Sequence, residues 1–170
     1  DKLHATVYES DDEAAAIWQT ETDVAHIHRC GKRDNFWEMG ETGPCGPCSE
    51  LHIDRGPDAC DQPPGHSCGV NSGCARYIEL WNLVFIQYNR DAHGTLTPLA
   101  TPCIDTGAGL ERLAAYKQGV LSVYDTDLFQ PIIQAVQGLL PDSVLADQRV
   151  IADHLRTVSL GIADGVLPSN

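Results

Sequence analysis

Two side-chain amides, those of Asn82 and Gln87, interrupt the most apolar stretch of the chain, residues 76–90 (RYIELWNLVFIQYNR). An amide on a buried strand costs free energy unless its donors and acceptors find partners. Asn82 is therefore either a hydrogen-bonded group of the core or a side chain that reaches into a pocket among its apolar neighbours. The pattern leaves both interpretations open.

The segment CIDTGAGLER, residues 103–112, places an acid and two glycines just before a helix. The free N–H groups of a helix N-terminus suit an anion, and Gly107 and Gly109 would let a ligand approach the backbone. Asp105 could hold an ammonium group or cap the turn. Arg112 is either a solvated charge or a phosphate clamp, for which a guanidinium is well shaped.

A region poor in apolar side chains, residues 55–75, contains Cys60, His66, Cys68 and Cys74. These are ligand types for tetrahedral zinc, and a segment without its own core gains most from a metal. The spacing, C-x5-H-x-C-x5-C, differs from the standard zinc-knuckle spacings. A flexible loop with free thiols is the competing interpretation.

The stretch GPCGPC contains a Cys-x-x-Cys at Cys45 and Cys48. A redox pair of this kind belongs at a helix N-terminus in a parallel βαβ unit, which the surrounding sequence does not offer. A zinc site at this pair would need its other two ligands from residues 55–75. We interpret the run as a stiff loop whose prolines fix the backbone.

Composition narrows the class of protein. The 170 residues are 42% apolar and 21% charged, as in a folded soluble domain. No run is long enough to span a bilayer and no signal peptide is evident, so we expect a cytoplasmic protein without a membrane partner. The net charge of -13 argues against DNA or any generic phosphate surface. Seven cysteines cannot all pair within one chain, and clustered thiols in the cytosol favour metal or burial.

Periodicity predicts the elements that must position these residues. Strand patterns occur at residues 3–8, 50–54, 76–90 and 96–107. Helical spacing occurs at residues 10–21, 109–117, 125–140 and 146–165. Ser10 is the expected cap of the first helix, with Glu13 completing a capping box. Residues 30–49 should be loop. Because strands come first and helices follow, we predict an α+β fold with an antiparallel sheet and a helical C-terminal part.

Several blocks together resemble alanyl-tRNA synthetase, a class II aminoacyl-tRNA synthetase. They are NFWEMGETGPCGPCSELHIDRG, YIELWNLVFIQYNRDAHGTLTPL, IDTGAGLERLAA, YDTDLF and RVIADHLRTVSLGIADGVLPSN, in that order. The resemblance implies the class II catalytic sheet, a ligase that uses ATP with Mg²⁺ to activate alanine to alanyl-adenylate, and transfer to the 3′ end of tRNA(Ala).

The resemblance also implies roles for single residues. GAGLER is similar to motif 3, whose arginine, here Arg112, binds ATP phosphates beside Gly107 and Gly109. Trp37, Asn82, Val84, Asp105 and Gly107 would form the alanine pocket, with Asp105 pairing with the ammonium group. Asp105 and Arg112 would be the residues most important for catalysis.

Two departures from the family pattern matter. Ala108 stands where motif 3 usually has methionine, and motifs 1 and 2 would precede residue 1. We therefore expect an excised part of the catalytic domain that is inactive alone, with residues 1–140 in the catalytic core and 141–170 beginning the helical tRNA-recognition region. The alternative is a zinc-stabilised binding module that kept the scaffold without catalysis.

Overall fold

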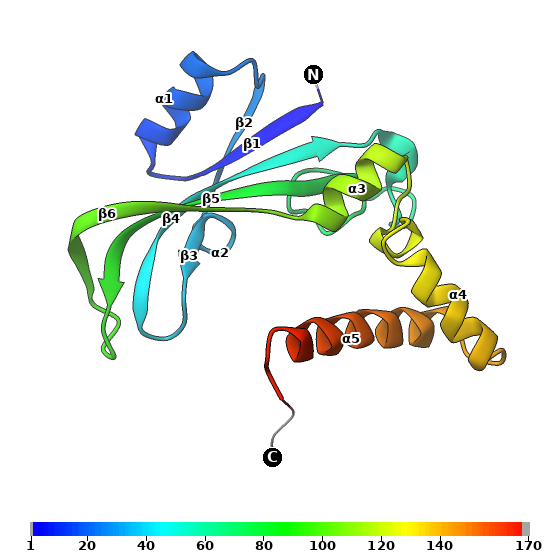
Figure 1. Cartoon of the computed structure of the whole chain (residues 1–170). Coiled ribbons are helices and arrows are strands. Elements are labelled where there is room, and N and C mark those ends of the chain that lie inside the picture. The colour runs from blue at the N-terminus through cyan, green and yellow to red at the C-terminus, as the bar shows by residue number, and fades with distance from the viewer. Residues whose placement is uncertain (1, 168–170) are drawn as a thin grey trace. The chain divides into compact units, whose positions relative to one another are not determined.

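The computed structural model describes residues 2–167, and Figure 1 shows its strands and helices. Its elements in chain order are β1 (Leu3–Tyr8), α1 (Asp12–Glu21), β2 (His26–Cys30), α2 (Lys32–Asn35), β3 (Phe36–Glu38), β4 (Gly43–Asp54), the 3-10 turn η1 (Pro57–Ala59), β5 (Tyr77–Arg90), β6 (Leu96–Ala108), α3 (Leu110–Gln118), the 3-10 turn η2 (Val123–Asp125), α4 (Gln130–Leu139) and α5 (Leu145–Ala163). The last three residues of the predicted region 141–170 lie outside the described part.

The strands form a mixed sheet in the order β2-β1-β4-β5-β6, with β3 added to β4. All neighbours are antiparallel except β1 and β2, which are parallel because α1 returns the chain between them. The α+β class is thus confirmed, with one parallel pair at the edge. β5 and β6 are joined by a tight turn at residues 91–95.

Helix α1 covers one face of the sheet (Figure 1). Ala14 and Ala15 pack on Val7, and Phe85 joins this cluster from β5. The cap is Asp11, whose carboxylate accepts from the N–H of Ala14 at 2.9 Å. The cap expected at Ser10 is therefore wrong by one residue, and Glu13 lies at the second helical position instead of the third, which a capping box requires.

The loop expected at residues 30–49 is wrong. That stretch ends β2 and contains α2, β3 and the first half of β4, so GPCGPC is part of a strand and not a stiff loop. Its glycines and prolines hide the alternating pattern of a strand. They fit because the pairing of β4 with β5 shifts register between Cys45 and Cys48, which interrupts the ladder.

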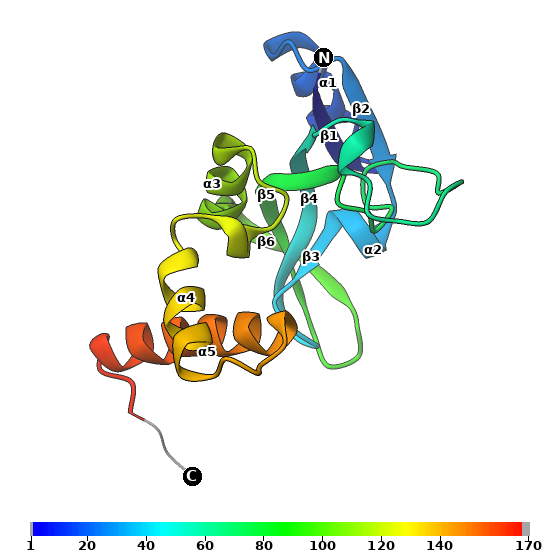
Figure 2. The same ribbon diagram turned by 90° about the vertical axis from the view of Figure 1, so that its right-hand side faces the viewer.

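The chain divides into two compact units, residues 1–113 and 114–170. The sheet belongs to the first unit. In the second, α4 lies against α5 (Figure 2). Phe129, Ile133 and Ala152 form the buried cluster between them. The division of function expected at residue 140 stays a prediction. None of the helices between residues 2 and 167 has both the length and the apolar character needed to cross a bilayer.

Candidate functional site

The face of the sheet opposite Val7 brings the predicted pocket residues together. Across three strands, Glu50 of β4 pairs with Asn82 of β5, which pairs with Gly107 of β6. A second row lies two residues further along β5. There Val84 pairs with β4 on one side and with Asp105 of β6 on the other. Because directly paired residues share a face of a sheet, these side chains form one surface.

The pocket residues on this surface are accessible. Asn82 and Val84 are half-buried, and Asp105 and Gly107 are exposed. The Oδ1 atom of Asn82 is buried without a hydrogen-bond partner, which leaves one acceptor unsatisfied. A Cβ added at Gly107 would meet no atom within 4 Å. Trp37 lies in β3, paired with Gly46 of β4, at the register shift beside this surface.

Arg112 lies in the first turn of α3, directly after the strand that carries Asp105. Its Nη1 atom is 2.9 Å from Oε2 of Glu79 and also donates to the Glu79 carbonyl at 3.1 Å. Both side chains line a cavity of about 490 Å³. Gly109 keeps the turn narrow, since a Cβ there would lie 3.1 to 3.3 Å from the Arg112 side chain.

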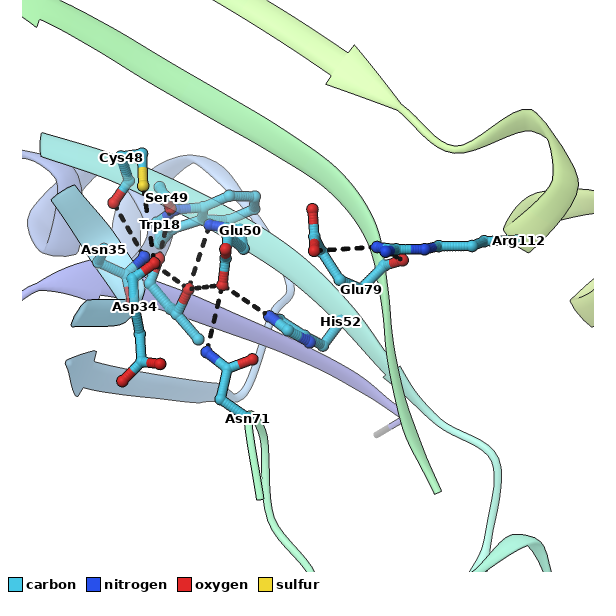
Figure 3. A network of polar contacts seen from close by, with 11 residues as sticks. Trp18, Asp34, Asn35, Cys48, Ser49, Glu50, His52, Asn71, Glu79 and Arg112 are labelled. Atoms are coloured by element: carbon cyan, nitrogen blue, oxygen red, sulfur yellow. Dashed lines mark hydrogen bonds and ion pairs between the residues drawn. The ribbon is translucent and has the colours of Figure 1, made fainter. Parts of the chain in front are cut away.

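Glu50 is the buried carboxylate of this cavity, and it is only 8% exposed. Its Oε2 atom accepts from Oγ1 of Thr6 at 3.2 Å. The same atom accepts from Nδ2 of Asn71 at 3.4 Å and lies 3.0 Å from Nε2 of His52 (Figure 3). Burial raises the pKa of Glu50, but the hydrogen bonds from His52, Asn71 and Thr6 outweigh it and hold the pKa below its usual value. The group is therefore a carboxylate at neutral pH.

The support for Glu50 extends into the core. Nδ2 of Asn35, which is fully buried, donates to Oγ1 of Thr6 at 2.8 Å and to the Cys48 carbonyl at 3.0 Å. Thr6 in turn holds Glu50. Such chains fix a side chain because each buried polar group depends on the next. Sequence reasoning missed Glu50 and His52; the alternation of polar residues in ELHID was the signal that could have found them.

The cysteines separate into two groups. The Sγ atoms of Cys60, Cys68 and Cys74 lie within 4.8 Å of one another, and all seven cysteines are free thiols. His66 is outside this group of convergent ligand atoms, although its Nε2 atom is buried without a hydrogen-bond partner. Three of the four predicted ligands, the cysteines, are thus brought together, and the histidine is not.

The other pair, Cys45 and Cys48, is buried in β4. Burial, with the nearby carboxylates of Glu50 and Glu79, raises the pKa of Cys48 to about 12. A thiol with that pKa is protonated at neutral pH and is a poor nucleophile and metal ligand. The chemistry of a redox pair is therefore absent from this position.

Comparison with known proteins identifies the family. The chain matches the family described as tRNA synthetases class II (A) over residues 1–170. It belongs to the class II tRNA synthetases. The alanine–tRNA ligase of Acidithiobacillus ferridurans is 54% identical over 178 residues, covering 100% of this chain and 20% of the relative. Those of Oleidesulfovibrio alaskensis and Chlorobaculum tepidum are 51% and 50% identical, with the same coverage. The chain spans about a fifth of the length of these relatives.

Within this synthetase domain, the base of the 55–75 insertion is tied to the sheet. Asp54 holds the guanidinium of Arg76 through two contacts of 2.7 and 2.6 Å. The pKa of Asp54 is far below its usual value, chiefly because of these hydrogen bonds. Arg55 donates to the Ala75 carbonyl on the other side. The cysteine loop therefore leaves the synthetase sheet from a fixed base.

A histidine stack, made of His4, His26 and His28, continues the same face toward β2. The rings of His4 and His26 are stacked at 4.4 Å, and Nδ1 of His4 lies 2.9 Å from Nε2 of His28. Burial and repulsion between the histidines lower the pKa of His4 and of His28. The stack adjoins His52, which pairs with His4 across the strands.

The synthetase sheet also has an apolar cavity of about 360 Å³ on its opposite face. Ala14 and Ile17 of α1, Phe85 of β5 and Ile104 of β6 line it. None of the predicted site residues faces it. Its apolar lining and its place against α1 mark it as incompletely covered core.

Proposed function

We propose that this chain supplies the alanine pocket and part of the ATP site of an alanine–tRNA ligase. The observation that carries the proposal is the single surface on which Asn82, Val84, Asp105 and Gly107 meet, with Arg112 following on the helix after it. Half-identical relatives named alanine–tRNA ligase support the same activity. The protein would work in the cytoplasm.

The alanine side of the site follows from charge and size. Asp105 offers a carboxylate to the substrate ammonium, and Asn82, whose buried Oδ1 atom has no partner, would offer a second acceptor after a rotation of its side chain. Val84 and Gly107 leave a small apolar space suited to a methyl group, and Trp37 would close it. Larger side chains would clash with the walls of this space, but an apolar pocket gains only about 1–3 kcal/mol per methylene and rejects an added hydroxyl weakly.

The ATP side depends on positioning. The alanine carboxylate attacks the α-phosphorus, the bond to the bridging oxygen breaks, and pyrophosphate leaves. Arg112 would release Glu79 and bind the ATP phosphates in its place, which would neutralise their negative charge. Mg²⁺ prefers carboxylate oxygens, so Glu79 and Glu50 are the groups of the cavity that would hold it; the metal supplies charge neutralisation on the leaving group.

Transfer to the 3′ end of tRNA(Ala) would use the same pocket, but the tRNA body needs a basic surface. The net charge of -13 places that surface outside this chain. Motifs 1 and 2, expected before residue 1, would supply the second phosphate-binding arginine.

Alanine-dependent exchange of pyrophosphate into ATP tests the proposal. We expect the full-length gene product to catalyse exchange with alanine well above valine, and this 170-residue chain alone to be inactive. Failure of the full-length protein with alanine would refute the proposed function. Robust exchange by the chain alone would refute the view that half of the site lies elsewhere.

We also propose that Cys60, Cys68 and Cys74 bind zinc, with His66 moving in as the fourth ligand. Two thiolates on one tetrahedral zinc lie about 3.8 Å apart, for Zn–S bonds of about 2.3 Å, so the observed limit of 4.8 Å needs only small shifts. The unpartnered Nε2 of His66 supports its role.

Metal analysis of the purified chain tests the zinc site, and melting with and without a chelator tests what it stabilises. We expect about one zinc per chain and a lower melting temperature after chelation. A metal-free chain, or a disulfide between two of the cysteines, would refute it. If the full-length protein binds zinc but never activates alanine, the alternative of a zinc-stabilised binding module is favoured.

A further inference from the structure

The segment between Cys68 and Cys74 forms one wall of the cavity that contains Glu50 and Arg112. Asn71, Gly73 and Cys74 all line that cavity. One proposed metal ligand is therefore also a wall residue. A change in the metal site would therefore act directly on this wall of the cavity.

Asn71 is the point of contact between the two sites. Its Nδ2 atom donates to Oε2 of Glu50 at 3.4 Å, the longest of that oxygen's contacts (Figure 3). Its backbone is left-handed, with φ of 57°, a conformation that asparagine tolerates better than most residues. The local turn is held by Ser72, whose Oγ accepts from the N–H of Gly69 at 3.0 Å.

The wall has little apolar packing of its own. Cys74 is its one residue in the buried hydrophobic set of the described chain, and Asn71 and Gly73 are exposed. A loop of this kind is ordered by cross-links more than by burial, and bonds from Cys68 and Cys74 to one ion would clamp both ends of the turn. The amide of Asn71 would then be held against Glu50.

We propose that metal bound to the three cysteines sets the affinity of the cavity for the nucleotide, with Asn71 as the positioning residue. This inference rests on the zinc site and the ATP site proposed above. Held by Asn71, Thr6 and His52, the Glu50 carboxylate keeps one orientation toward the ligand. Without metal, the turn moves away, Glu50 loses one donor, and the nucleotide binds more weakly.

Substitutions at Asn71 separate this role from metal binding. Asn71→Gly keeps the left-handed backbone but removes the amide, and Asn71→Asp replaces the donor with a charge that repels Glu50. In the full-length protein with zinc loaded, we expect the Kd for ATP to rise about three- to tenfold for the glycine variant, which corresponds to one hydrogen bond, and further for the aspartate variant. Ser67→Ala, an exposed change in the same loop, is the matched control and should leave Kd unchanged.

Removal of the metal provides the second arm. Chelation of the full-length protein should raise the Kd for ATP by a factor similar to that of Asn71→Gly, and should add little in that variant. In the isotope-labelled 170-residue chain, the side-chain amide resonance of Asn71 and the carboxyl resonance of Glu50 should both shift on chelation, a readout independent of activity.

Each failure points to a different claim. A chain that holds no zinc refutes the metal site, and absent exchange with alanine refutes the proposed activity. If zinc is bound, but its removal and Asn71→Gly both leave the Kd for ATP and the Glu50 resonance unchanged, the coupling between the two sites is refuted while both sites stand.

Discussion

Gly46 is the position where one added carbon should do the most damage. It lies in β4 opposite Trp37 of β3, and the backbone of β5 crosses it at the register shift. A Cβ at Gly46 would lie 1.9 Å from the carbonyl oxygen of Phe85 and 3.0 Å from the nitrogen of Gln87. Because the first obstacle is backbone, no side-chain rotation relieves it.

The cost of Gly46→Ala follows from that distance. Real Cβ atoms essentially never approach within 3.0 Å, so the strands must separate by 3.0 − 1.9 = 1.1 Å or more. Overpacking costs about 1–3 kcal/mol, and each ladder hydrogen bond lost costs about 1 kcal/mol more. We expect a loss of about 3–5 kcal/mol in the free energy of unfolding.

Urea unfolding followed by tryptophan fluorescence measures this loss, since all three tryptophans lie in the sheet unit. The control is Gly40→Ala, an exposed position outside the helices and strands where the nearest atom to an added Cβ is 3.9 Å away; it should stay within about 0.5 kcal/mol of the wild type. A Gly46→Ala chain within about 1 kcal/mol of the wild type would refute the reasoning.

Three further results follow from the contacts. The contribution of the histidine stack to the free energy of unfolding should be fully present above about pH 7 and should be lost as the pH falls below 6.5, because the lowered pKa values of His4 and His28 favour neutral rings in the folded state. Urea titrations between about pH 5 and pH 7 should show a smaller fall in His4→Gln than in the wild type, and equal falls would contradict this. Ser49→Ala should cost about 1–3 kcal/mol in urea titrations, because the indole N–H of Trp18 loses its acceptor at 2.7 Å; an unchanged midpoint would contradict this. Iodoacetamide should label exposed Cys103 long before Cys48, as peptide mass mapping would show, and the reverse order would contradict the burial of Cys48.

The strands with the strongest apolar pattern were predictable from sequence. The strand predicted at residues 3–8 is β1, and the long stretch at 76–90 is β5 with its hairpin partner β6. In these segments burial, β-branched residues and a turn all favour the same structure. The predicted α+β class followed from their order relative to the helices.

The half-polar strands were not predictable in the same way. HIHRC forms β2 although its side chains are polar, because stacked histidine rings take the place of apolar packing. GPCGPC hides the start of β4 because its glycines and prolines recur every third residue, without the alternation of a strand, and because Gly46 admits the backbone of β5. Glu50 was not predicted as a site residue because its environment is created by the fold. Its hydrogen-bond partners Thr6 and Asn71 are distant in the sequence, and nothing in the sequence shows that the side chain of His52 contacts it.

The central claim is that Asp105 and its neighbours on the sheet bind alanine as its adenylate. Calorimetric binding of a non-hydrolysable alanyl-adenylate analogue to the full-length protein tests it most directly. We predict that Asp105→Asn weakens binding about tenfold or more, because the ammonium loses its counter-charge, while Asp142→Asn, an exposed aspartate of the second unit, leaves it unchanged. Equal affinity of the wild type and Asp105→Asn would contradict the account.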